Sequence, residues 1–152
     1  MTSTSWKDIA EMVGIAAIVA SLVLVAYELR QNSAVATAQA VFDLNMSVDS
    51  AYRVRAQDPV LDELIDRGHS DPNTLSQREL SQFFAWLRAD MNLMEAAWFN
   101  FDSQIISEQN FDGYIAAACS RISTPGGQEF WTAEAKFFAA DFRKGIEDWC
   151  FN

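Results

Sequence analysis

The feature that most constrains this chain is an uncharged, proline-free run from Met12 to Tyr27, close to the N-terminus. At about 1.5 Å of rise per residue, a helix over this run covers about 24 Å, less than the roughly 30 Å of hydrocarbon in a bilayer. Extension to residues 9–29 reaches the full span and leaves Glu11 and Glu28 near its ends, where carboxylates stay hydrated among the headgroups. The sequence therefore predicts one transmembrane helix over residues 9–29.

Two other interpretations of the same run remain open. A cleaved signal peptide fits poorly, because Lys7 is offset by Asp8 and Glu11 and because helix-like sequence follows in place of a cleavage site. A buried helix of a soluble bundle would be equally apolar. Trp6 and Tyr27 flank the run and favour the membrane, since aromatic side chains are enriched at its interfaces.

Charge alone does not orient the span. The positive-inside rule counts Lys and Arg near the span ends, and Lys7 on one side balances Arg30 on the other. Cys119 and Cys150 match no metal or redox spacing, so the simplest interpretation is a pair of free thiols inside the cell. A disulfide in an external domain is the alternative. We expect a short outer tail over residues 1–8 and a C-terminal domain in the cytoplasm.

Composition limits what the remainder, residues 30–152, can do. This part carries 10 basic and 18 acidic residues, a net charge of −8, which repels phosphate and anionic lipid headgroups. We therefore expect no nucleic-acid partner and no peripheral role on a membrane surface. The length suits one domain with a small core.

The chain beyond the span has a helical pattern throughout, because few segments alternate strictly and Gly and Pro fall at only a handful of places. A helix over 31–57 should follow the span without a break and stop at Asp58-Pro59. Gly68 should end the next helix. The further helices are expected over 59–67, 76–101, 111–122, 128–139 and 141–149, the last two as one bent helix or two short ones. The predicted fold class is all-α, with a transmembrane helix continuing into a small helical bundle.

Apolar side chains recur at helical spacing on the two longest of these helices beyond the span. The helix over 31–57 has an approximate stripe of Val35, Ala38, Phe42, Met46, either Val48 or Asp49, and Tyr52. The helix over 76–101 opens with a capping box of Ser76 and Glu79. Its broad apolar face comprises Leu80, Phe83, Phe84, Leu87, Met91, Met94, Trp98 and Phe101.

Several motifs together resemble a known family. They are Glu11-Met12-Val13-Gly14, Ala20-Ser21-Leu22, Leu29-Arg30-Gln31-Asn32, Asn92, Glu95, Trp98-Phe99, Thr124-Pro125-Gly126-Gly127, Phe130-Trp131, Phe137-Phe138 and Phe142. The chain resembles a widespread family of uncharacterised bacterial single-pass membrane proteins whose N-terminal transmembrane helix ends in an Arg-Gln-Asn signature. The resemblance implies a helical domain anchored in the bacterial inner membrane, with no assigned activity. Glu28 departs from the family, in which Gln is frequent.

Small residues recur along the span at three- and four-residue spacing. They are Gly14, Ala17, Ser21, Ala16 and Ala20, which we expect to form one face. Small side chains let helix backbones approach closely in lipid, where hydrophobicity gives no drive to associate. The span would then dock on another membrane subunit or on a second copy. An alanine-rich helix surrounded by lipid is the alternative.

Residues suited to chemistry are scarce. Arg88, Asn92 and Glu95 lie at roughly helical spacing beside aromatic residues, and form either a ligand pocket with a perturbed acid or a structural ion pair. Asp62, Asp66 and His69 have a weak metal-ligand spacing. The chain has one His, which excludes paired-His di-iron and haem sites. We therefore expect no catalytic residue, no metal and no cofactor.

The segment after residue 124 is rich in aromatic residues. Thr124-Pro125-Gly126-Gly127 lacks the Lys and the preceding strand of a phosphate loop, so we expect a turn. Core packing should use most of the aromatic side chains that follow, and any left exposed would form a partner patch. The candidates are Phe130, Trp131, Phe137, Phe138, Phe142 and Trp149.

Two functional interpretations from different classes follow. In the first, the chain is a non-enzymatic accessory or scaffolding subunit that docks on other membrane proteins, or on itself, through its span and its helical domain. In the second, it is a membrane-anchored sensor or enzyme that binds a small ligand near Arg88 and Glu95. A soluble domain that uses residues 9–29 as core is a third. The scarcity of chemical side chains favours the first.

Overall fold

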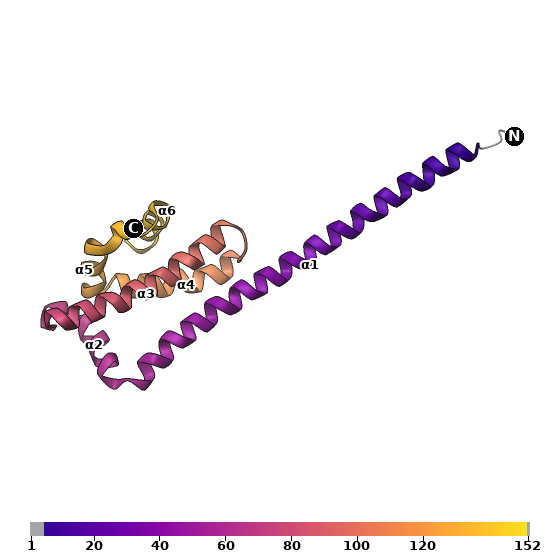
Figure 1. Cartoon of the computed structure of the whole chain (residues 1–152). Helices are drawn as coiled ribbons and strands as arrows, with labels where there is room; N and C mark the ends of the chain where they lie inside the picture. The colour runs from indigo at the N-terminus through magenta and orange to yellow at the C-terminus, as the bar shows by residue number, and fades with distance from the viewer. Residues whose placement is uncertain (1–4, 152) are drawn as a thin grey trace. The chain divides into compact units, whose positions relative to one another are not determined.

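The apolar N-terminal run lies in a long helix. The computed structural model describes residues 5–151, and over this range the chain is helical with no strand, which confirms the all-α prediction. The α-helices are α1 (Trp6–Gln57), α2 (Pro59–Ser70), α3 (Gln77–Asp102), α4 (Glu108–Ile122), α5 (Pro125–Glu134) and α6 (Ala140–Cys150), with short 3-10 helices η1 (Pro72–Thr74) and η2 (Ala135–Phe137). Figure 1 shows the chain coloured from its N-terminus to its C-terminus.

The chain divides into two compact units, with the boundary between Ala38 and Gln39. Hydropathy predicts the boundary between the span and the domain at residue 30, which is earlier in the chain than this structural boundary. The first unit contains the part of α1 up to Ala38. Of the short tail expected over residues 1–8, residues 1–4 lie outside the described range and residues 6–8 already belong to α1. Its apolar side chains are exposed, and by length and composition this helix can cross a membrane.

The break after α1 occurs where Asp58-Pro59 predicted it. Asp58 adopts an extended backbone, and its carboxylate accepts hydrogen bonds from the amides of Val60 (3.0 Å) and Leu61 (3.1 Å). Pro59 occupies the first turn of α2, where its missing N–H costs nothing. The aspartate and the proline therefore end one helix and begin the next.

The expected end of α2 at Gly68 is wrong. The helix continues to Ser70, and Gly68 is buried inside it against the ring of Phe83 on α3. A Cβ at Gly68 would lie 2.6 Å from two ring carbons of Phe83. Glycine at this position allows the close approach of two helices and does not terminate one.

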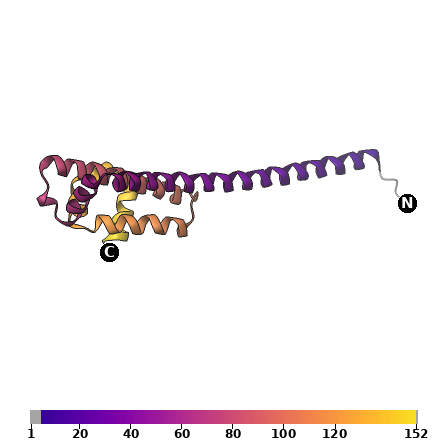
Figure 2. The same ribbon diagram turned by 90° about the horizontal axis from the view of Figure 1, so that it is seen from below.

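Helix α3 begins with the predicted capping box. The Ser76 amide donates to Oε2 of Glu79 at 2.8 Å, and the Glu79 amide donates to Oγ of Ser76 at 3.4 Å. Helix α4 begins earlier than expected, at Glu108, because Oγ of Ser107 accepts a hydrogen bond from the Asn110 amide. Helices α3 and α4 lie side by side in both views (Figures 1 and 2).

The segment after α4 forms two short helices separated by η2. The first starts at Pro125, earlier than expected, because Oγ1 of Thr124 accepts a hydrogen bond of 3.0 Å from the Gly127 amide and so caps the helix. The expected turn at Thr124-Pro125-Gly126-Gly127 is thus one capping residue followed by the first turn of α5. Helix α6 covers the region predicted for the last helix.

The core of the second unit draws on five helices. Its main cluster contains Leu64, Ile65, Phe83, Leu87, Met91, Met94, Ala118, Ile122, Phe130, Trp131, Phe138, Phe142 and Ile146. Four residues of the predicted apolar face of α3 belong to this cluster, namely Phe83, Leu87, Met91 and Met94. The prediction of that apolar face is therefore confirmed. A smaller cluster of Leu44, Ala97, Ile106 and Phe111 attaches α1 to α3, α4 and the loop between them.

The stripe predicted on residues 31–57 is only in part the packed side of α1, since Val48 is partly buried whereas Phe42 and Met46 are exposed. Leu44 is the buried residue of this helix, with Ala40 and Val41 packed around it. Phe42 and Met46 are 58% and 52% exposed. At about 100° per residue, Phe42 and Met46 each lie about 160° around the helix from Leu44, so packing selected the opposite face.

Candidate functional site

The predicted polar cluster on α3 separates into individual structural contacts. The Arg88 guanidinium pairs with Glu134 at the end of α5, and its Cζ lies 4.7 Å above the centre of the Phe137 ring. Oε1 of Glu95 accepts a hydrogen bond of 2.6 Å from the amide of Ala139, the residue that precedes α6. Both side chains therefore position the connection between α5 and α6.

Asn92, the third member of this cluster, is exposed on the surface of α3. The structure thus favours the structural interpretation of Arg88 and Glu95 that the sequence left open beside the ligand pocket. The larger grooves described below are lined by other residues. A ligand site near Arg88 and Glu95 stays a prediction.

Two grooves flank the second half of α1 within the second unit. One has a volume of about 340 Å³ and lies against α4, with Asn45, Tyr52, Tyr114 and Arg121 among its lining residues. The other has a volume of about 320 Å³ and lies against α3, where Trp86 contributes to its wall. This part of α1 is therefore only partly embedded in the bundle.

Polar contacts supplement the limited apolar packing of α1. The Tyr114 hydroxyl donates to Oδ1 of Asn45 at 3.0 Å, and Nη2 of Arg121 donates to the Tyr52 hydroxyl at 2.8 Å. Arg55 pairs with Asp62 and Asp66 of α2. Each bond joins α1 to another helix of the second unit.

Arg121 is also half of an ion pair inside the bundle. Its Nη1 donates to both carboxylate oxygens of Asp90 on α3, each at 2.8 Å. The two side chains are only 15% and 9% exposed. Burial raises the pKa of Asp90 above its usual value, while the guanidinium opposes that effect by favouring the charged carboxylate. Removal of either partner would leave the other charge buried and unpaired.

His69 is partly buried between helices, although the expected helix end at Gly68 would have placed it outside α2. It belongs to α2, its ring packs edge-on to Phe83 and Trp86, and its Nδ1 lies 2.9 Å from Oγ1 of Thr124. The Thr124 hydroxyl donates its one proton to the carbonyl of Arg121, so Nδ1 of His69 must be the donor to Thr124. Burial lowers the pKa of His69 to about 4, and the charges of Arg55 and Arg121 act in the same direction. The imidazole is therefore neutral at neutral pH.

The metal-ligand spacing of Asp62, Asp66 and His69 does not produce a cluster. Both aspartates bind Arg55, and the histidine faces Thr124. Among residues 5–151, no group of three or more His, Cys, Asp or Glu side chains has the proximity that a metal ion requires.

Core packing uses most of the aromatic side chains after residue 124, as expected, and this removes four of the six candidates from the partner patch. Phe130, Trp131, Phe138 and Phe142 are buried and pack on one another. Phe137 and Trp149 remain 62% and 41% exposed. The exposed Phe137 packs beneath Arg88, and Trp149 packs on Trp98 and Phe111. Both rings are therefore partly used within the chain.

The small residues of the span do not all share one face. At about 100° per residue, Gly14, Ala17 and Ser21 lie within about 60° of one another, whereas Ala16 lies about 160° from Gly14 and Ala20 about 120° from it. The expectation of a single face of five residues is therefore wrong. A Cβ at Gly14 would meet nothing within 4 Å. The Ser21 hydroxyl donates to the carbonyl of Ala17 at 2.9 Å and needs no other partner.

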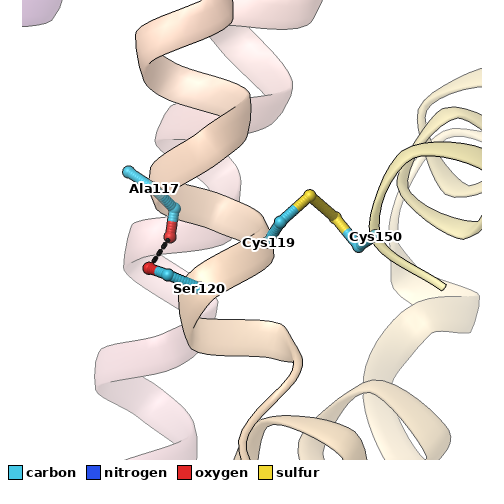
Figure 3. Close-up of a disulfide and its surroundings, with 4 residues drawn as sticks. All are labelled: Ala117, Cys119, Ser120 and Cys150. Carbon is cyan, nitrogen blue, oxygen red and sulfur yellow. Dashed lines mark hydrogen bonds between the residues drawn. A yellow bond between two sulfur atoms is a disulfide. The ribbon is translucent and has the colours of Figure 1, made fainter.

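The expectation of two free thiols is wrong. Cys119 on α4 and Cys150 at the end of α6 form a disulfide, with their Cα atoms 4.8 Å apart (Figure 3). The chain has two cysteines, and both take part in this bond. The bond joins α6 covalently to α4.

Sequence reasoning also missed the residues that attach α1 to the bundle. Tyr52, Asp90 and Arg121 come from three helices and carry no shared motif, so only their tertiary proximity could identify them. Comparison of the chain with known protein families, curated proteins and solved structures finds no match. The family resemblance therefore stays a prediction.

Proposed function

We propose that this chain is a non-enzymatic accessory subunit that inserts residues 9–29 into a membrane, docks there on a helix of another membrane protein, and presents its acidic helical domain to that partner. The observation that carries the proposal is the exposure of the apolar part of α1. From Met12 to Val25 its large hydrophobic side chains are each more than half exposed. Soluble monomers rarely leave so long an apolar surface in water.

The character of this segment favours lipid as its surroundings. Residues 12–27 carry no charge, and a helix over residues 9–29 is about 31 Å long, which matches the hydrocarbon thickness. Every amide of a helix interior is paired within the segment, as hydrocarbon requires. A bundle-core role for residues 9–29 has little support, since the most apolar part of the helix is unburied.

The docking part of the proposal rests on Gly14, Ala17 and Ser21. Their side chains are small, so a second helix can approach the backbone of α1 closely beside them. The non-enzymatic part rests on how the charged side chains of the domain are used. Arg88, Glu95 and the other paired groups described above bind neighbouring elements of the domain.

The experiment is a mild-detergent purification of the tagged full chain from its native membrane, followed by mass spectrometry of the proteins that accompany it. A membrane protein in stoichiometric amount supports the proposal and identifies the partner. Recovery of the chain alone, or as an oligomer of itself, contradicts docking on another protein. Recovery in the soluble fraction without detergent contradicts the anchor.

A matched pair of variants tests the docking face. Gly14→Leu with Ala17→Leu adds bulk on the small-residue face and should abolish co-purification of the partner. Val23→Leu is the control, because Val23 lies about 180° around the helix from Gly14 and the change keeps the span apolar. Equal partner recovery from both variants would place the docking elsewhere.

A further inference from the structure

The disulfide between Cys119 and Cys150 carries information about the compartment of the helical domain. Cys119 lies in the last turns of α4 and Cys150 is the final residue of α6, and Figure 3 shows the bond bridging the two helices. Each cysteine is partly buried. The bond therefore belongs to the packing of the domain and not to an exposed loop.

The packing of α6 brings the two sulfur atoms together. The start of α6 is held by the hydrogen bond from the Ala139 amide to Glu95, and Phe142 and Ile146 bury its apolar side in the main core. With these anchors set, the last residue of α6 lies beside α4. The packing of α6 against α4 thus keeps Cys150 beside Cys119.

The spacing of the pair identifies the bond as structural. The cysteines are 31 residues apart and come from different helices, unlike the Cys-X-X-Cys pairs of thiol–disulfide exchange enzymes. Structural disulfides persist in oxidising compartments, whereas the reducing systems of the cytosol keep such thiols reduced. A domain that relies on this bond is expected on the oxidising side of its membrane.

We propose that the span is oriented with its N-terminal end in the cytoplasm and with the domain that follows in the oxidising extracytoplasmic compartment, the periplasm in a bacterial cell. This inference rests on the membrane anchor proposed above. It reverses the orientation that free thiols suggested. The charge rule does not oppose it, because Lys7 and Arg30 balance and acidic residues contribute little to orientation.

The chemistry of the bond requires an oxidant in that compartment. Conversion of two thiols into one disulfide releases two protons and two electrons. A thiol–disulfide oxidoreductase supplies the oxidising equivalent by exchange, so that its own disulfide is reduced to two thiols while the S–S bond of this chain forms.

The first test measures the state of the cysteines in cells. Cells that express the full chain are quenched in acid, and free thiols are tagged with a maleimide of high mass before electrophoresis. We expect no mass shift without reduction and a two-tag shift after reduction. A two-tag shift without reduction, in a host whose own extracytoplasmic disulfides remain oxidised, overturns the proposal.

The second test reads orientation without depending on the disulfide. Single cysteines are introduced as Ser5→Cys and Ser33→Cys in a chain that also carries Cys119→Ser and Cys150→Ser, because Ser5 and Ser33 are exposed at opposite ends of the span. Intact spheroplasts are treated with a membrane-impermeant maleimide. Labelling of S33C in intact spheroplasts, with S5C labelled only after lysis, supports the proposal. The reverse pattern overturns it.

Fractionation separates the failure of this inference from the failure of the anchor. The same spheroplast membranes are extracted with alkaline carbonate. A chain that remains in the pellet but is labelled at S5C in intact spheroplasts is anchored in the opposite orientation. This result supports the membrane anchor and contradicts the proposed orientation. A chain released into the supernatant does not span the membrane, which contradicts both the anchor and the orientation.

Discussion

Gly126 of α5 lies directly against the backbone of Gly68 in α2. A Cβ at Gly126 would be 1.9 Å from the carbonyl oxygen of Gly68 and 2.9 Å from its carbonyl carbon. Both glycines are buried, and neither has a positive φ. The two residues are therefore glycine because the helices α2 and α5 touch, and not because the backbone adopts a special conformation.

Substitution of Gly126 by Ala should destabilise the domain strongly. The new methyl group meets backbone atoms that cannot rotate away, so α2 and α5 must separate, at a cost of about 3 kcal/mol in the free energy of unfolding. Urea unfolding of the full chain in mild detergent, followed by tryptophan fluorescence, measures the loss.

The control is Gly113→Ala on α4. A Cβ at Gly113 meets nothing within 4 Å, and alanine is the better helix former by about 0.5–1 kcal/mol. G113A should therefore match or exceed the wild type in stability. Equal destabilisation by G126A and G113A would contradict the close contact of α2 with α5.

Loss of the Glu95 carboxylate should weaken the start of α6. Glu95→Ala removes the acceptor for the Ala139 amide and should lower the free energy of unfolding by about 1–2 kcal/mol, as loss of a helix cap does. Glu95→Gln keeps an oxygen acceptor and should lose less. Asn92→Ala, an exposed change on the same helix, should stay within about 0.5 kcal/mol of the wild type. The same loss for E95A and N92A would exclude the capping role.

Reduction of the disulfide should lower stability by an amount set mainly by the loop it closes. With the cysteines 31 positions apart in the sequence, the unfolded chain regains conformational freedom worth about 3–4 kcal/mol on reduction. The expected result is a lower urea midpoint in the presence of dithiothreitol. The variant with Cys119→Ser and Cys150→Ser is the control, since reductant should leave its midpoint unchanged. An identical wild-type midpoint with and without reductant would mean that the bond is not formed.

The partly buried His69 should make the domain sensitive to mild acid. Its pKa is about 4 in the folded protein and 6.5 ordinarily, so the unfolded chain binds the additional proton between these values. Stability should be complete above pH 6.5 and fall as the pH decreases to about 4, with a total loss of up to about 3 kcal/mol.

A comparison with His69→Gln isolates this contribution. Glu79, whose pKa is lowered to about 2 by hydrogen bonds from Ser76 and Arg67, titrates in both proteins, as does Asp90. The difference in unfolding free energy between wild type and H69Q should therefore change between pH 6.5 and pH 4 and be constant outside that window. A difference that is constant from pH 7 to pH 4 would contradict the neutral buried imidazole.

The helices were predictable where the determining contacts are local. The capping box of Ser76 and Glu79 and the Asp58-Pro59 break each involve neighbours in sequence, and the structure places both where the residues indicate. The apolar face of α3 was predictable for the same reason, because spacing along one helix decides which side chains share a side.

The remaining features depend on contacts between distant segments. Whether Gly68 ends a helix or accommodates a ring depends on Phe83, and whether Phe130 is core or surface depends on Phe84 and Phe138. The spacing of Arg88 and Glu95 suggested one site, but their partners lie at different points along the chain between α5 and α6. Sequence separation likewise gave no sign that Cys119 and Cys150 would meet.

The disulfide makes the last part of the chain a closed covalent ring. The ring runs from Cys119 through the end of α4, α5 and η2 to Cys150. A single backbone cut inside it, for example at the exposed Phe137 of η2, opens the ring without separating the two pieces. A protease that nicks this segment would therefore leave a chain of full mass on a non-reducing gel, and the cut would become visible only after reduction.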